Sequence, residues 1–434
     1  MHTGNDRPLR LTLSLFVASL LAGCSSSPPA VDSAPQDGPR GDAVTDGARL
    51  EGRIDARLVD LRPDGPRPPA AWKKVPVTPN LDLEDHTATL LSSGDVLVVG
   101  GVTGSGSSDP DVYHKKAYRY VPAQNAFVDA GAMAAVRAEH SATLLPDGRV
   151  LVVGGIDDSS YYLTSVEIYD PAKPAPSAWS AGPQMIQSAW QHSAVRLQDG
   201  KVLISGGTPY GVDSTEKLAL FDPATNTWSV PATVMKVKRR LHSSTLLKNG
   251  KVLFAGGTQG TGPNNLTFLN SLEIYDPVQG STTLLAAKLE TPRAAHTATL
   301  LDDGRVLIVG GSCTGSSCGT GSWLNNIYDP ATDKITPVAH PGDAPSGHCA
   351  VKLQDGRVLV FGDSEYVGGE YVGSVKTLAF SPAGAGSWSN QPDLLVGRWS
   401  ASCVMLPDGT VLAVAGVTKA SGPRTYADTE RFYP

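Results

Sequence analysis

One sixteen-residue pattern occurs seven times along this chain and constrains its fold more than any other feature. Most copies begin with His, carry Asp-Gly or Asn-Gly near the centre, and end with a pair of glycines. Successive copies begin 50 to 54 residues apart, a period typical of propellers and other repeat arrays. The copies occupy residues 86–101, 140–155, 192–207, 242–257, 296–311, 348–363 and 401–416.

Each copy predicts a β-hairpin. Asp147-Gly148 and Asn249-Gly250 supply the positive φ angles that a tight turn requires. The flanking runs are apolar and β-branched at successive positions, which is typical of strands buried on both faces. A closing pair such as Gly154-Gly155 permits a close backbone approach that a Cβ would block.

The rest of each unit repeats too, and it predicts two further strands. A third strand ends in an aromatic residue followed two positions later by Pro, at Tyr120, Tyr169, Phe221, Tyr275, Tyr328, Phe380 and Phe432. A fourth strand begins near a large residue 13 or 14 positions before the next copy, at Phe127, Trp179, Trp228, Ile335 and Trp388. The unit after Tyr275 shows this signal only weakly.

The seventh unit reaches Pro434 directly after its third strand. Trp72 lies 14 residues before His86, which is the spacing of a fourth strand. We therefore expect the segment near Trp72 to complete the last blade and close the ring, which leaves no large unpaired sheet edge.

The combination of a glycine pair, a Tyr and a spaced Trp resembles the Kelch repeat over residues 72–434. The resemblance implies an all-β fold, a seven-bladed Kelch-type β-propeller like the central domain of galactose oxidase, with four-stranded blades around a channel. We expect this domain to occupy residues 71–434 and to be a monomer.

The N-terminus predicts export. An apolar run over residues 11–21 follows Arg7 and Arg10 and is too short to span a bilayer, so residues 1–23 read as a signal peptide. The segment Leu21-Ala22-Gly23-Cys24 resembles the lipobox of bacterial lipoproteins, which implies lipidation of Cys24 and anchoring without insertion through the membrane.

The residue that follows Cys24 bears on the membrane. Ser25 stands where some retained inner-membrane lipoproteins carry Asp, so the resemblance implies the outer membrane. Residues 24–70 are rich in Pro, Asp and Gly and poor in aromatic residues, which predicts an extended linker rather than a packed core.

Charge excludes one class of partner. The net charge is −6, only 18% of residues are charged, and no basic stripe occurs, so nucleic acid is not an expected partner.

Arginines recur three residues before the repeat position, and two interpretations stay open for them. They could cap neighbouring loops, or they could form an anion-binding rim, since some Kelch propellers bind acidic peptides through arginines in this loop. The candidates are Arg137, Arg239, Arg293 and Arg398, with Arg240 beside Arg239.

Three tryptophans stand outside the fourth-strand position, namely Trp190, Trp323 and Trp399. Tyrosines occur in the same group of loops, at Tyr161, Tyr162, Tyr210, Tyr366 and Tyr371. Exposed rings on a rigid face suit stacking on sugars or a protein hot spot, whereas buried rings would only pack beneath the loops. We treat the arginines and the three tryptophans as a candidate ligand-binding face.

Six histidines share the first repeat position, at His86, His140, His192, His242, His296 and His348, and Ala401 takes the seventh. Strand side chains point toward neighbouring blades, so we expect these rings to satisfy repeated buried polar groups rather than to bind a metal. Copper-radical oxidases of the Kelch type need two Tyr and two His on copper, one His coming from an additional domain. The Tyr113-His114 pair is a poor match, so we predict no catalytic residue, cofactor or metal.

The cysteines predict one small disulfide. Cys313 and Cys318 bracket a short loop, and a disulfide between them suits an exported protein. Cys349 and Cys403 lie on inner strands of adjacent blades, one step out of phase, and could pair or stay free; we expect them to be free. Asp157-Asp158 is a weak calcium signal.

These observations predict a membrane-anchored, non-catalytic binding protein whose partner is a protein or polysaccharide of the envelope or the surroundings. The alternatives are a copper-radical oxidase-like or other carbohydrate-active enzyme, and a scaffold without a small ligand. Fold-level resemblance alone does not transfer function.

Overall fold

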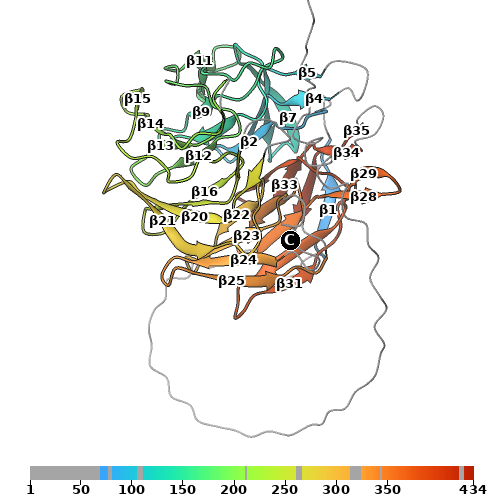
Figure 1. The fold of residues 1–434 in the computed structure, drawn as a ribbon. Helices are drawn as coiled ribbons and strands as arrows, with labels where there is room; N and C mark the ends of the chain where they lie inside the picture. The colour runs from blue at the N-terminus through green and yellow to red at the C-terminus, as the bar shows by residue number, and fades with distance from the viewer. Residues whose placement is uncertain are drawn as a thin grey trace, which may run out of the picture.

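The computed structural model describes residues 69–76, 81–104, 111–210, 213–260, 266–312, 324–342, 345–419 and 425–434. In this part of the chain the regular elements are β-strands, and seven four-stranded antiparallel sheets stand around a ring as blades (Figure 1). The expected seven-bladed propeller is confirmed. Across the same residues, no helix has the length and apolar character that a membrane crossing requires.

Six blades use four strands in chain order. Blades 1 to 3 comprise β2 (Thr87–Leu90), β3 (Val96–Val99), β6 (Lys116–Val121), β7 (Ala126–Ala132); β8 (Ser141–Leu144), β9 (Val150–Val153), β10 (Val166–Tyr169), β11 (Trp179–Ala181); and β12 (Ser193–Arg196), β13 (Val202–Ser205), β14 (Leu218–Asp222), β15 (Thr227–Ser229). Blades 4 to 6 comprise β16 (Ser243–Leu246), β17 (Val252–Ala255), β20 (Ser271–Asp276), β21 (Ser281–Lys288); β22 (Thr297–Leu300), β23 (Val306–Val309), β24 (Leu324–Asp329), β25 (Lys334–Ala339); and β26 (Cys349–Lys352), β27 (Val358–Phe361), β30 (Thr377–Ser381), β31 (Ser387–Asn390).

Blade 7 joins the two ends of the propeller. Its inner strands are β32 (Ser402–Met405), β33 (Val411–Val414) and β36 (Glu430–Tyr433), and its outer strand is β1 (Ala71–Lys74). Trp72 pairs with Phe432 in register, and their ring centroids lie 5.1 Å apart. In Figure 1 the blue strand β1 lies beside the red strands of the C-terminus. The predicted closure by an N-terminal strand is therefore confirmed.

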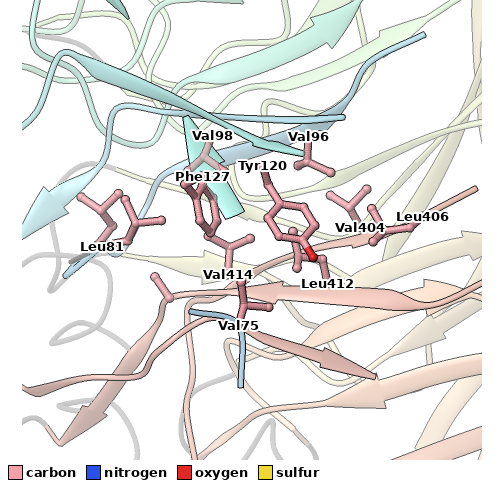
Figure 2. Close-up of a cluster of buried hydrophobic side chains, with 12 residues drawn as sticks. Val75, Leu81, Val96, Val98, Tyr120, Phe127, Val404, Leu406, Leu412 and Val414 are labelled. Atoms are coloured by element: carbon pink, nitrogen blue, oxygen red, sulfur yellow. The ribbon is translucent and has the colours of Figure 1, made fainter. Parts of the chain in front are cut away.

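The hydrophobic core lies between blades. The second strand of every blade is buried at all four positions, as its β-branched runs predict. Apolar clusters fill the gaps between neighbouring blades. Figure 2 shows the cluster that joins the chain ends, where Tyr120 and Phe127 of blade 1 meet Leu412 and Val414 of blade 7. Each such side chain contributes roughly 1.5–3 kcal/mol on full burial.

Glycine is required where the second strand ends. Gly154 has a φ of 61°, and a Cβ added there would lie 2.4 Å from the Ala189 carbonyl oxygen of the next blade connection. The same close approach recurs at the equivalent glycines, such as Gly206 against the Arg239 carbonyl oxygen. The repeat glycines therefore allow neighbouring blades to approach closely.

The fourth strands carry the expected ring contacts. Trp179, Trp228 and Trp388 lie 5.1–5.2 Å from the aromatic residue that ends the third strand of their own blade. In blade 4 the sequence signal is weak, yet β21 extends over eight residues. Its pairing with β20 contributes what a tryptophan contributes elsewhere.

The loops between second and third strands form small sheets on one face. β4 (Val102–Thr103) pairs with β5 (Val112–Tyr113), and β18 (Thr258–Gln259) with β19 (Thr267–Phe268). Blades 6 and 7 share a sheet of β28 (Ser364–Val367), β29 (Glu370–Gly373), β34 (Val417–Lys419) and β35 (Thr425–Tyr426).

The expectation of free Cys349 and Cys403 is wrong, because they form a disulfide with a Cα–Cα distance of 6.1 Å. Alternate strand positions point to opposite blade faces, and opposite faces of adjacent blades face each other. The one-step phase difference therefore directs both sulfur atoms into the same interface. The other pair, Cys313 and Cys318, lies outside the described residues, as does Cys24.

Candidate functional site

Four of the five candidate arginines lie in the interior and do not form an exposed rim. Arg137, Arg239, Arg293 and Arg398 each have an exposed fraction of 0%. A ligand outside the propeller cannot reach these guanidinium groups. Only Arg240, at 6% exposure, lies beside candidate ligand contacts, and it too is largely covered. The rim interpretation is therefore corrected to a structural one.

A buried carboxylate explains the position of these arginines. Arg137 donates to Glu167 at 2.9 Å, and Arg239 donates to Glu273 at 2.5 Å. Each glutamate also accepts backbone N–H groups from the loop that carries its arginine, as Glu167 does from Ala134 at 2.7 Å. Burial lowers the pKa of the arginines, and the adjacent carboxylate opposes that shift. The pair fixes the connection between two blades.

The pairing follows a pattern that the repeats display. Glutamate stands two residues before the third-strand aromatic in blades 2, 4 and 7, which are the blades entered through Arg137, Arg239 and Arg398. Blade 5 has Arg293 but places buried Asn326 at that position. Blades 1, 3 and 6 lack both residues. Arg and Glu therefore occur together, a signal of a structural pair that was available in the sequence.

The repeat histidines are structural, as expected. In five interfaces the ring Nε2 lies 2.8–3.0 Å from a Ser or Thr hydroxyl of the preceding blade. Burial lowers their pKa, to about 4 for His192 and about 3 for His296. The rings are therefore neutral at pH 7, and they connect blades.

This arrangement does not fit a copper centre. The repeat rings lie in separate interfaces, and His114 is 2.8 Å from the Thr103 hydroxyl beside a cleft of about 230 Å³. Within the described ranges, no three His, Cys, Asp or Glu side chains come together to hold a metal ion. Asp157 instead accepts the N–H groups of Ser159 and Tyr161, both at 2.9 Å, and shapes its own loop.

The three candidate tryptophans have different environments. Trp399 is 3% exposed and packs against Gly347, so its expected place on a ligand face is wrong. Trp323 lies outside the described residues. Trp190 is half-buried and belongs to a group of rings that reaches the surface.

That group, the aromatic cluster, consists of Tyr161, Tyr162, Trp190 and Tyr210. Tyr162 stacks on Trp190 with ring centroids 4.7 Å apart, and Tyr210 lies edge-on to Tyr162 at 5.7 Å. Tyr161 lies 5.5 Å from Tyr210, and these two rings are 56% and 60% exposed. The cluster combines a packed base with an exposed outer pair.

The backbone holds the cluster in place. Trp190 bridges to Thr208, and Tyr162 bridges to Ile156, which joins the fourth-to-first and second-to-third loops on one face as expected. The backbone N–H of Tyr210 donates to the Ser188 hydroxyl at 2.9 Å. The Arg240 guanidinium lies 5.7 Å from the Trp190 ring and donates to the Thr208 hydroxyl at 3.3 Å.

Next to the cluster is a ring of residues that sequence reasoning missed. It consists of the residue before each repeat position, all with φ between 51° and 69°: Asp85, Glu139, Gln191, Leu241, Ala295, Gly347 and Ser400. Backbone bonds link successive members, such as Glu139 N–H to the Asp85 carbonyl at 3.0 Å. First strands of neighbouring blades contact each other, which places this channel-mouth ring around the axis.

The backbone of the channel-mouth ring repeats while its side chains differ. Asp85, Glu139 and Gln191 are polar, whereas Leu241, Ala295 and Gly347 are apolar or small. A position with constant backbone and variable side chain is not fixed by folding, so it is free to serve recognition. Aligning the seven copies and comparing this column would have identified it.

The comparisons with known proteins agree with this architecture. The model of the KLHDC2/KLHL20/DRC7 Kelch-repeats domain matches residues 85–311, which is more than half of the chain. The chain belongs to this family. A comparison with curated proteins found no relative.

One solved structure resembles this Kelch propeller, and its title reads "Novel fungal alcohol oxidase with catalytic diversity among the AA5 family, in complex with copper". The TM-score is 0.63 at 20% sequence identity, and the match covers 84% of this chain and 76% of that one. At this identity the likeness shows the fold alone, and the fold supports a binding or scaffold role.

Proposed function

We propose that this protein is an exported, lipid-anchored binding protein whose Kelch propeller recognises a glycan through the aromatic cluster. The observation that carries the proposal is the exposed pair Tyr161 and Tyr210 above the packed rings of Tyr162 and Trp190. Rigid rings with one open face suit stacking against the apolar face of a sugar, and immobilising them costs little conformational entropy.

Two features support the anchor on Cys24 and an outer-membrane location. The disulfide between Cys349 and Cys403 suits an oxidising compartment outside the cytoplasm. In addition, Ala71 pairs with Tyr433 at the end of a third strand, which lies at the hairpin-turn face. The chain therefore enters the propeller at the face opposite the aromatic cluster, and an anchor on Cys24 would leave the cluster directed away from the membrane.

A copper oxidase is the second candidate, because the listed likeness in fold is to a copper-containing alcohol oxidase. The environment of the histidines argues against it, since their Nε2 atoms meet hydroxyl groups between blades. A protein partner in place of a glycan is the outcome to which the binding test below can lead.

The test is binding of the full chain, purified in detergent, to a panel of envelope and environmental polysaccharides. We expect the Tyr161→Ala/Tyr210→Ala variant to lose binding by roughly 30-fold, about 2 kcal/mol, because two hot-spot rings are removed. Val278→Ala is the control, since Val278 is 95% exposed in a turn at the opposite face. Failure of the parent to bind any polysaccharide would refute glycan recognition and direct the search to protein partners.

The anchor has its own test. Cys24→Ser removes the lipid attachment atom, so we expect the protein to move from the membrane to the soluble fraction. Continued detergent-dependent association of the variant with membranes would contradict a lipid anchor at this residue.

A further inference from the structure

The polar part of the channel-mouth ring borders the aromatic cluster. Gln191 follows Trp190 in the chain, and its Nε2 donates to the Glu139 carboxylate at 3.0 Å. Asp85 is the next member of the ring, bonded through its carbonyl oxygen to the Glu139 N–H. One continuous surface thus runs from exposed rings to two half-buried carboxylates.

Gln191 leaves a buried acceptor at this place. Its exposed fraction is 8%, and its Oε1 has no hydrogen-bond partner within the described part of the chain. Because Nε2 of the same amide is bonded to Glu139, Oε1 lies beside the carboxylates. A buried polar atom without a partner is costly, so this oxygen points to a donor that arrives with a ligand.

The charges around the two carboxylates are unbalanced. Glu139 and Asp111 both act on Asp85 with like charge, and together with burial they raise the pKa of Asp85. Arg240 is the cation that acts on Glu139, but its guanidinium is turned to Trp190 and Thr208. The mouth therefore presents acceptors and an excess of negative charge.

Resting on the proposed function, we infer that the channel mouth binds the ammonium group of an amino sugar whose ring stacks on the aromatic cluster. An ammonium group carries three donors and a positive charge, which matches Asp85, Glu139 and Gln191 Oε1. A sugar hydroxyl brings a single donor and no charge. A lysine side chain would satisfy the mouth equally well but would leave the exposed rings without a partner.

The experiment compares two ligands that differ only in the charged group. Binding of the full chain to an oligomer of glucosamine and to an N-acetylglucosamine oligomer of equal length is measured by calorimetry. We expect the amine form to bind at least about tenfold more tightly, since a hydrogen bond to a charged group exceeds a neutral one.

Isosteric variants then test the residues. Asp85→Asn and Glu139→Gln should each abolish the preference for the amine while leaving the melting temperature and N-acetyl oligomer binding unchanged. Asp393→Asn is the control, because it makes the same charge change at an exposed position. Its preference should equal that of the parent.

Two outcomes would overturn the inference separately from the proposed function. Equal or tighter binding of the N-acetyl oligomer would reject ammonium recognition but keep glycan binding. A preference that survives in both variants would show that it arises from overall charge rather than from the channel mouth. If neither oligomer binds, amino sugars are rejected, and the polysaccharide panel alone decides glycan recognition.

Discussion

The interface between blades 6 and 7 differs in chemistry from the five interfaces that precede it. In those five, a repeat histidine meets a hydroxyl of the preceding blade at 2.8–3.0 Å. Between blades 6 and 7, Ala401 replaces the histidine, Cys349 stands where most other blades have Ser or Thr, and a disulfide to Cys403 joins the blades. The same backbone thus accepts a neutral hydrogen bond or a covalent bond as its interblade connection.

The interface between blades 7 and 1 differs in another way, because it is made by chain ends. β1 supplies the outer strand of blade 7, and Trp72 packs 4.8 Å from Phe361 of blade 6. Val75 and Leu81 then enter the cluster between blades 7 and 1. The comparison teaches that closure depends on a strand from outside the local repeat.

Deleting residues 71–80 should have the largest effect. It removes β1, Trp72 and Val75, so two interfaces lose buried side chains, and we expect a loss above about 5 kcal/mol in the free energy of unfolding. Thermal unfolding followed by circular dichroism measures it. An unchanged melting curve would contradict closure by β1.

Cys349→Ala/Cys403→Ala should have the next largest effect. The cross-link encloses a separation of 54 residues, and we expect its loss to cost about 2–4 kcal/mol. Adding reductant should lower the melting temperature of the parent and leave the variant unaffected. Cys349→Thr/Ala401→His/Cys403→Ala should recover about 1 kcal/mol by rebuilding the ordinary interface. No recovery would mean that the two connections are not interchangeable.

His192→Gln should have the smallest effect and should appear as a change in pH dependence. The folded pKa of His192 is about 4, below the usual 6.5, so the unfolded chain binds the proton first. The stability contribution is complete above pH 6.5 and is lost as the pH falls toward 4. We expect the parent to lose on the order of 2 kcal/mol more than the variant between pH 7 and pH 4. Parallel stability curves would contradict a neutral buried ring.

The fold was predictable because the repeat encodes it redundantly. Asp-Gly turns, paired glycines and the spacing of Trp72 each identify the hairpins, the close approaches and the closing strand. The interfaces were harder, because contacts between blades depend on which face a side chain takes. Cys349 and Cys403 differ by one strand position, and only the facing of adjacent blades turns that offset into a pair.

The candidate site was predictable only in part. Trp190 belongs to a surface cluster, but a loop position did not reveal that Arg137 and Trp399 are buried. Their burial is determined by partners on the next blade, Glu167 for Arg137, and by the space that Gly347 leaves for Trp399. Comparing columns across the seven copies separates such fixed positions from the variable channel-mouth ring.

The closing strand has a mechanical consequence. Any tension carried by the chain before Ala71 enters the propeller at β1, and the four residue pairs between β1 and β36 bear it first. Pulling at this end acts on the Ala71–Tyr433 pair before the others. If the strand were peeled away, blades 6 and 7 would still be joined through Cys349 and Cys403. Blade 7 is thus both the blade that receives the load and one of the two that are covalently fastened.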